Sequence, residues 1–341
     1  MTTSVLEAIE WQVDEAAKER MEPGICHSFM ASLATSMNYI EGQVDFAWLM
    51  GVTGFAFRVF MNKNLCPSAM SMFDFSAVLP EAVEQAGYHC GYVSRMWDEE
   101  ALEKERREQG HLAIAEEIEQ GRPAIVWDVA DCEWGLIVGY DNKRKVYMTL
   151  TQAGKPAKLK YERLGRNGID ILSVAIPRGR NSRSREDVVH KSLMVAVDHA
   201  EQREHTDRPE YENGLAGFEM WAKVMDQGSA LAKAGKLTCC GDDALMFAEY
   251  FAGCLYGSRC YARDYLRKIA DGDNHLAKAA ACYEKVAACL RPVWECFEKR
   301  RWPEAGVFQR LGQHIRDARE VEEKGVESIK MYLGVDTGDV S

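Results

Sequence analysis

Apolar and polar positions in the first half of the chain follow helical spacing in some segments and strand spacing in others. Apolar residues three and four apart predict helices over 5–20, 28–40, 75–86 and 98–120. Runs rich in β-branched and aromatic residues predict strands over 88–95, 122–129, 133–142, 145–150 and 169–176, with a hairpin turn at 141–144. Helices followed by antiparallel strands are typical of an α+β domain, which we expect over residues 1–180.

The pattern changes at residues 177–187, which read PRGRNSRSRED and predict a polar linker. The four arginines of this segment could bind a phosphate group, but we favour a solvated linker. Beyond it, apolar residues three and four apart predict only helices, over 188–201, 211–225, 242–256, 277–300 and 305–333. We therefore expect an all-α helical bundle over 186–341, with Pro292 ending or kinking its fourth helix.

Composition limits the partners and the cellular location expected for this chain. The chain has 341 residues, 47% of them hydrophobic, and a formal net charge of −11, which argues against a nucleic-acid partner. The longest apolar run, 46–57, is too short to cross a membrane, and the acidic N-terminal segment lacks the pattern of a signal peptide. We therefore expect a cytoplasmic protein that has no membrane partner.

Eleven cysteines are spread along the chain, and none of them forms a Cys-x-x-Cys pair. Cys239 and Cys240 are adjacent, while Cys282, Cys289 and Cys296 are seven residues apart, a spacing typical of one buried stripe of a helix. We expect most of the thiols to be reduced and buried, and we expect neither a metal site nor a cofactor.

One cysteine lies at a position in the chain that favours a reactive thiol. Residues 24–39 read GICHSFMASLATSMNY, which places Cys26 immediately before a helix of small and apolar residues. Backbone N–H groups at a helix N-terminus stabilise a thiolate, and they can also hold the oxyanion that forms when the thiolate attacks a carbonyl. Cys26 is therefore a candidate nucleophile. The alternative is a buried cysteine that packs as a small hydrophobe.

The order of a cysteine-capped helix, further helices and then the hairpin strand EWGLIVGYD resembles the papain-like fold of bacterial double-glycine leader peptidases. The wider chain, with GVTGFAFRVFMNKNLCPS at 51–68 and YENGLAGFEMWAKVM at 211–225, is similar to the butirosin-biosynthesis protein H-like family. The resemblance implies a papain-like domain over 1–180. It also implies transfer of an acyl group from a thioester to an amine acceptor. A carrier protein could hold the thioester.

The chain departs from the family pattern at the catalytic positions. The pattern places its histidine six residues before Gly139, and this sequence has Glu133 there. A carboxylate is a poor substitute, because its charge raises the pKa of a nearby thiol where an imidazolium would lower it. The family's orienting Asp or Asn is also missing at 149–151, and its glutamine before the cysteine is replaced at 19–22. Only one member of the catalytic triad is visible.

Other residues are candidates for the site. Glu133 could act as a general acid or base against Trp134 and Trp127, could bind a substrate ammonium group, or could be an exposed strand-end carboxylate. His27 and His89 could contact substrate; we favour a surface or capping role for His27 and a half-buried structural role for His89. In the helical half, the candidate substrate contacts are Tyr211 and Trp221, each of which also fits a helical core.

Three functions follow from these residues. The first is cysteine-dependent acyl transfer, in which Cys26 forms an acyl intermediate and an amine resolves it to an amide, with Glu133 as the second catalytic residue. A thiolate leaves without needing a proton, so transfer from a thioester tolerates the missing histidine. The second function is a papain-like binding module that has lost catalysis. The third is a cysteine peptidase or amidase with an atypical base.

Overall fold

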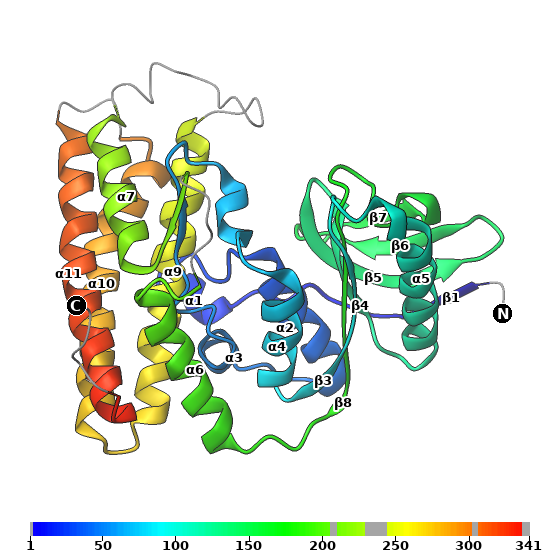
Figure 1. Ribbon diagram of the computed structural model, residues 1–341, viewed down its shortest axis with the longest axis horizontal. Helices are drawn as coiled ribbons and strands as arrows, with labels where there is room; N and C mark the ends of the chain where they lie inside the picture. The colour runs from blue at the N-terminus through cyan, green and yellow to red at the C-terminus, as the bar shows by residue number, and fades with distance from the viewer. Residues whose placement is uncertain (1–2, 205–209, 229–243, 302–305, 336–341) are drawn as a thin grey trace. The chain divides into compact units, whose positions relative to one another are not determined.

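The computed structural model describes residues 3–204, 210–228, 244–301 and 306–335 (Figure 1). The chain forms two compact units, and the segments that make up one unit alternate along the sequence with those of the other. Unit 1 comprises residues 1–14, 27–49 and 74–183, and unit 2 comprises residues 15–26, 50–73 and 184–341. The boundary at 183/184 falls inside the predicted linker, but two earlier segments, 15–26 and 50–73, also belong to the helical unit.

Unit 1 is built on an antiparallel sheet in the order β3-β8-β4-β5-β6-β7, with β1 also pairing with β5. The strands are β1 (Thr3–Val5), β3 (Tyr88–Arg95), β4 (Ala124–Ala130), β5 (Glu133–Asp141), β6 (Val146–Leu150), β7 (Pro156–Lys160) and β8 (Leu172–Arg180). The strand predictions are confirmed. β5 is central, because it pairs with β1, β4 and β6.

The helices of unit 1 are α2 (Ser28–Glu41), α4 (Phe75–Gln85) and α5 (Glu103–Glu119), with 3-10 turns at Glu100–Leu102 and Tyr161–Arg163. α3 (Phe46–Val52) crosses from unit 1 into unit 2. Phe29 of α2 packs against Trp134 of β5, whereas Ile114 and Ile118 of α5 pack in a cluster with Ile137. Trp134 and Ile137 are an odd number of residues apart on one strand, so α2 and α5 cover opposite faces of the sheet.

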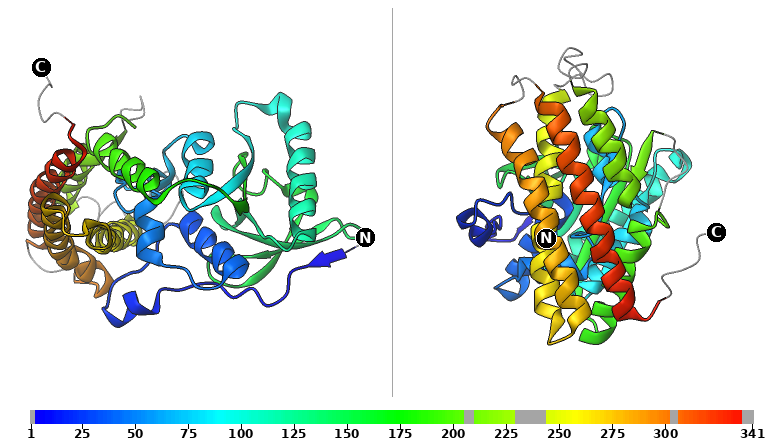
Figure 2. Two further views of the ribbon diagram at one scale, coloured as in Figure 1. Left: turned by 90° about the horizontal axis from the view of Figure 1, so that it is seen from below. Right: turned by 90° about the vertical axis from the view of Figure 1, so that its left-hand side faces the viewer.

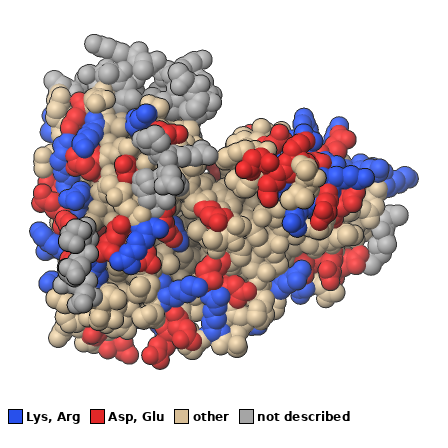
Figure 3. Space-filling view, viewed as in Figure 1, with Lys and Arg blue, Asp and Glu red and all other residues tan. Residues whose placement is uncertain are grey.

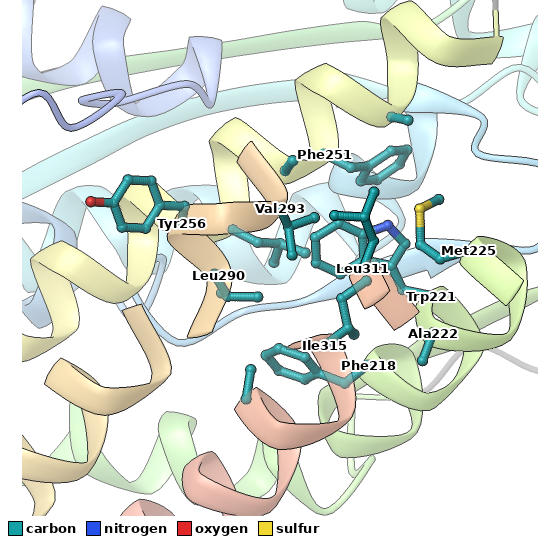
Figure 4. Packing of buried hydrophobic residues seen from close by; sticks show 14 of the residues in the cluster. Phe218, Trp221, Ala222, Met225, Phe251, Tyr256, Leu290, Val293, Leu311 and Ile315 are labelled. Atoms are coloured by element: carbon teal, nitrogen blue, oxygen red, sulfur yellow. The ribbon is translucent and has the colours of Figure 1, made fainter. Parts of the chain in front are cut away.

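Unit 2 is largely helical. Its helices are α1 (Glu15–Glu19), α6 (Arg185–Ala200), α7 (Gly214–Asp226), α9 (Ala244–Ala270), α10 (Asn274–Glu298) and α11 (Val307–Leu333), with a 3-10 turn at Pro67–Ser71. The three long helices α9, α10 and α11 lie side by side (Figure 2). Side chains such as Trp221, Phe251, Leu290 and Leu311 meet in the core that α7 forms with them (Figure 4). The helical C-terminal region is thus confirmed.

α10 contains Pro292 and continues to Glu298, so of the two effects expected of this proline the helix end is excluded and the kink stays a prediction. Two other expectations about secondary structure were wrong. Residues 5–20 do not form one helix: Val5 pairs with Gly139 in the sheet, Ala8 has a positive φ of 58°, and only α1 is helical. A short strand, β9 (Tyr211–Asn213), pairs with β2 (Phe60–Asn62) in the half that was expected to be all helical. Asp242, where another helix was expected to begin, lies outside the described residues.

The segment 177–187 is largely exposed, as expected of a linker, but its two ends belong to β8 and α6. β8 continues to Arg180, and the side chain of Asn181 donates to the backbone oxygen of Glu84 at 2.7 Å. Three of its arginines pair with carboxylates of unit 1: Arg178 with Glu117 at 2.9 Å, Arg180 with Glu41, and Arg183 with Glu81. These pairs bind the segment to the sheet and its helices. No phosphate need be invoked to explain their charge.

Along the described ranges, no helix is both long and apolar enough to cross a membrane.

Candidate functional site

Glu133, the candidate for the base position in the sequence analysis, is the first residue of β5. Its partner is Ser28, the first residue of α2: the Ser28 hydroxyl donates to Glu133 Oε2 at 2.5 Å and accepts the backbone N–H of Trp134 at 3.2 Å. Ser28 is buried and Glu133 is half-buried. The hydroxyl therefore joins the N-terminus of α2 to the start of β5.

Aromatic rings pack around this contact. The ring of Trp134 lies 5.1 Å from that of Phe29, 5.3 Å from that of Trp127 and 5.5 Å from that of Phe75, measured between centroids. Trp134 is fully buried, so its role in the structure is that of a core residue.

The turn before Glu133 is held by a buried carboxylate that the sequence analysis missed. Asp128 of β4 accepts the backbone N–H groups of Cys132 at 3.1 Å, Gly168 at 2.5 Å and Ile169 at 3.0 Å. Its φ of 56° belongs to the left-handed region, which is uncommon for residues other than glycine. The register of β4 against β5 shifts between Val126 and Ala130, and Asp128 fixes this irregular turn.

Burial raises the pKa of Glu133 above its ordinary value, and the nearby Asp131 raises it further, while the hydrogen bond from Ser28 lowers it. The two effects of the surroundings oppose each other because burial disfavours the ionised form and the hydroxyl donor favours it. A carboxyl group with this balance can exchange a proton nearer to neutral pH than an exposed glutamate does.

Cys26 precedes the helix and is not part of it. α2 begins at Ser28, its N-cap is His27, and no side chain caps it, so Cys26 lies one residue before the cap. Cys26 is the last residue of the segment 15–26 in unit 2, and it is partly buried as a free thiol. A Cβ placed on Gly253 of α9 would lie 3.8 Å from its sulfur and 3.6 Å from Trp294. The thiol also has a polar partner, since its sulfur lies 3.9 Å from the backbone oxygen of Gly24.

The predicted pairing of Cys26 with Glu133 joins a residue of unit 2 to a residue of unit 1, and it stays a prediction. Within unit 1, the carboxyl group of Glu133 is bonded to Ser28 instead.

The two histidine candidates differ from expectation. His27 is the N-cap of α2 and is buried, 8% exposed, so it is not a surface residue, and it makes no capping bond. His89 is on β3 with a side chain that is 64% exposed, and its Nδ1 lies 3.6 Å from Glu84. His89 is therefore a surface residue and not a half-buried one.

The two aromatic candidates of the helical half contribute to packing in unit 2. Trp221 of α7 is fully buried in the core formed with α9, α10 and α11. Tyr211 begins β9, pairs with Asn62 of β2 and packs against the same core. Both positions fit the core interpretation, while their predicted contact with substrate stays a prediction.

The orienting position of the family pattern carries no acid or amide. Thr149 pairs with Ile137 across β5 and β6, is 2% exposed, and has no hydrogen-bond partner for its hydroxyl among the described residues. Asp128 had a signal in the sequence, a carboxylate inside the apolar strand AIVWDVA. Ser28 had none, because its partner Glu133 is 105 residues away.

Comparison with known proteins adds no relative: no family model matches the chain, and no curated protein is significantly similar to it.

Replacing Ser28 with Ala tests the contact at the core of this site. The variant should lose about 1–3 kcal/mol of unfolding free energy, because it leaves the half-buried Glu133 carboxylate and the Trp134 N–H without their partner. Urea titration followed by circular dichroism measures the change. Ser32→Ala is the matched control, since Ser32 is buried on the same helix and its hydroxyl has no partner among the described residues. Equal losses in both variants would contradict the assignment.

The loss caused by Ser28→Ala should also depend on pH. The Ser28 hydroxyl lowers the pKa of Glu133, so removing it raises that pKa and makes the folded state bind a proton more tightly. The free energy of unfolding of the variant, compared with that of the wild type, then falls as pH rises through the range in which Glu133 ionises. The difference between the two proteins should be larger at about pH 7 than at about pH 4. A constant difference would show that Ser28 does not act on an ionised carboxylate.

Proposed function

We propose that this chain is a papain-like protein that binds a ligand without turning it over, because the histidine that would pair with its thiol is replaced by Glu133. The observation that supports the proposal is the hydrogen bond from Ser28 to Glu133, at the helix N-terminus and at the base position. In a working papain-like site an imidazole stands at the base position and pairs with a thiol. Here the base position holds a carboxyl group, which accepts the hydroxyl of Ser28, two residues after Cys26.

The chemistry of this pair argues against activation of a nucleophile. A carboxylate raises the pKa of a neighbouring thiol, whereas an imidazolium would lower it. The Ser28 hydroxyl already uses its donor on Glu133 and accepts the N–H of Trp134, so its two bonds hold α2 against β5.

Cysteine-dependent acyl transfer is the second candidate, and the position of Cys26 favours it. The thiol is free, partly buried and one residue before the N-cap of α2. In this mechanism the Cys26 thiolate attacks the carbonyl carbon of a thioester, and the donor's C–S bond breaks to release a thiolate. An amine then attacks the acyl-Cys26 carbonyl, gives up a proton and forms an amide, which restores the thiol.

One experiment separates the two candidates. The protein is incubated with the N-acetylcysteamine thioester of acetate at about pH 7, and acylation of each cysteine is followed by peptide mass spectrometry. Cys132 is exposed and serves as the reference for non-specific acylation. Partial burial and the nearby Asp128 and Glu133 raise the pKa of the Cys132 thiol, so the acylation of this reference thiol should be slow. Under the binding proposal, Cys26 should be acylated no faster than Cys132.

The opposite result would overturn the binding proposal. It would consist of an adduct on Cys26 that forms faster than the one on Cys132, that is absent from Cys26→Ala, and that disappears when an amine is added. Glu133→Gln then reports the role of the carboxyl group: loss of the second step would identify it as a base, and faster formation of the adduct would identify it as an inhibitor of the thiol.

A further inference from the structure

Unit 1 has an open groove on the α5 side of its sheet, with a volume of about 820 Å³. Helix α5 forms one wall through Arg107, Glu108, His111 and Leu112. The turn between β5 and β6 together with the start of β6 contributes 144–147, and the end of β7 with the turn after it contributes 160–162. All of these residues belong to unit 1. We call this place the α5 groove.

The floor of the α5 groove is aromatic and rigid. The ring of Tyr161 lies 4.4 Å from that of His111 and 4.4 Å from that of Tyr147, measured between centroids. The ring nitrogen Nδ1 of His111 and the Tyr147 hydroxyl are 2.8 Å apart, and Tyr161 donates its hydroxyl to Asn142 at 3.0 Å. Tyr147 is fully buried, while Tyr161 and His111 are half-buried and present ring surface to the groove. A planar ring can stack on such a surface.

The walls of the α5 groove are basic, although the chain as a whole is acidic. Arg107, Arg144, Lys145 and Lys160 line it, against two carboxylates, Glu108 and Glu162. In Figure 3 lysine and arginine side chains lie among aspartate and glutamate side chains at the right-hand end of the view, where Figure 1 has α5 and the strands β6 and β7. His111 does not add to this charge, because burial lowers its pKa.

These cations are available to a ligand. Arg144 and Lys160 are 74% and 70% exposed, and their pairs with Asp141 and Glu162 are long, at 3.8 and 3.7 Å. Exposed pairs of this kind contribute little free energy, so the side chains can move to a stronger anion at small cost. Arg107 is held more firmly by Glu103 within α5, which fixes its guanidinium at the wall. Lys145 makes no ion pair with any other described residue.

From the basic walls and the aromatic floor we infer that the α5 groove binds a small anionic ligand that carries a planar ring, of the chemical class of nucleoside phosphates. The ring would stack on Tyr161, and the phosphates would lie among Lys145, Arg144 and Lys160. Arginine and lysine are the usual phosphate partners in proteins. The inference does not depend on the proposed function, since it uses none of the residues around Glu133 or Cys26.

Fluorescence titration of the full-length protein with N-methylanthraniloyl-ADP tests the inference. We expect saturable binding that unlabelled ADP reverses. Lys145→Glu and Tyr161→Ala should each weaken binding about tenfold or more, the first by removing charge and the second by removing the stacking surface. Lys158→Glu is the matched control, because Lys158 is exposed on the same strand as Lys160 but does not line the groove. Its affinity should equal that of the wild type.

Competition identifies which parts of the ligand are recognised. Adenosine and pyrophosphate should each compete more weakly than ADP, because each offers only one of the two features. The inference is overturned if the labelled nucleotide does not bind saturably, or if Lys158→Glu weakens binding as much as Lys145→Glu, which would indicate non-specific attraction. Circular dichroism of the variants at about 25 °C verifies that each is folded before it is compared.

Discussion

Replacing Glu322 with Ala should lower the free energy of unfolding of unit 2 by about 3–5 kcal/mol, the largest effect we expect of any single change. Glu322 of α11 is 3% exposed and pairs with Arg259 of α9, which is fully buried and donates its Nε to Glu322 at 2.9 Å. Removing the carboxylate leaves the guanidinium charge buried without its counterion. Breaking such a pair costs more than the pair itself contributes.

The arginine has further partners that make its position important. It donates to the backbone oxygens of Ala56 at 3.3 Å, Phe57 at 3.0 Å and Arg58 at 3.1 Å, so it binds the segment 50–73 to the helices of unit 2. Arg259→Lys should also destabilise the unit, because a lysine cannot bond the carboxylate and three carbonyl groups at once.

Urea titration followed by circular dichroism at the helical wavelength measures the effect of Glu322→Ala. Glu323→Ala is the matched control, since Glu323 is the next residue of α11 and its partner Arg319 is 3.6 Å away on the surface. The control should cost less than about 0.5 kcal/mol. If the two variants lose the same stability, the buried pair does not hold unit 2 together.

Replacing Asp128 with Ala should cost unit 1 about 3 kcal/mol, because three backbone N–H groups would lose a charged acceptor. An alanine at a positive φ adds to the cost, since it lacks the short polar side chain that lets aspartate and asparagine adopt the left-handed region. Asp128→Asn keeps the tolerance for this backbone conformation but has a single acceptor oxygen, so its loss should be intermediate. The free energy of unfolding from urea titration ranks the variants.

The effect of Asp128 should extend to the site, because the turn that it fixes leads directly into Glu133. We expect Asp128→Ala to increase amide hydrogen exchange over 131–134 as well as to lower stability. Asp131→Asn is the control: Asp131 is exposed in the same turn and also has a positive φ of 58°. A normal exchange pattern at 131–134 in Asp128→Ala would show that Asp128 does not position the start of β5.

Much of the fold could be predicted from short patterns. The helices 28–40 and 75–86 and the strands 88–95 and 145–150 were found within a residue or two, because apolar spacing of three to four or of two reports which face is buried. The same patterns failed at 5–20, where Val5 ends strand β1, residues 6–14 form neither helix nor strand, and only α1 is helical. A short isolated helix is marginal, so helical spacing alone does not secure one over this segment.

The segment 177–187 shows a different limit. Its composition is typical of a linker, yet Arg178, Arg180 and Arg183 all meet carboxylates contributed by α5, α2 and α4. A charged residue needs either water or an oppositely charged partner, and the sequence alone does not show which of the two surrounds it in the fold.

By itself, the sequence determined the helix that begins after Cys26, the strand that begins at Glu133 and the class of elements in each half, because these depend on neighbours a few residues away. Only the tertiary structure decided that Ser28 is bonded to Glu133, and that Asp128 holds the turn before it. Both contacts join residues at least 40 positions apart, with 105 between Ser28 and Glu133. Hydrogen bonds form wherever the packed elements bring a donor to an acceptor, and no local pattern of apolar positions records that meeting.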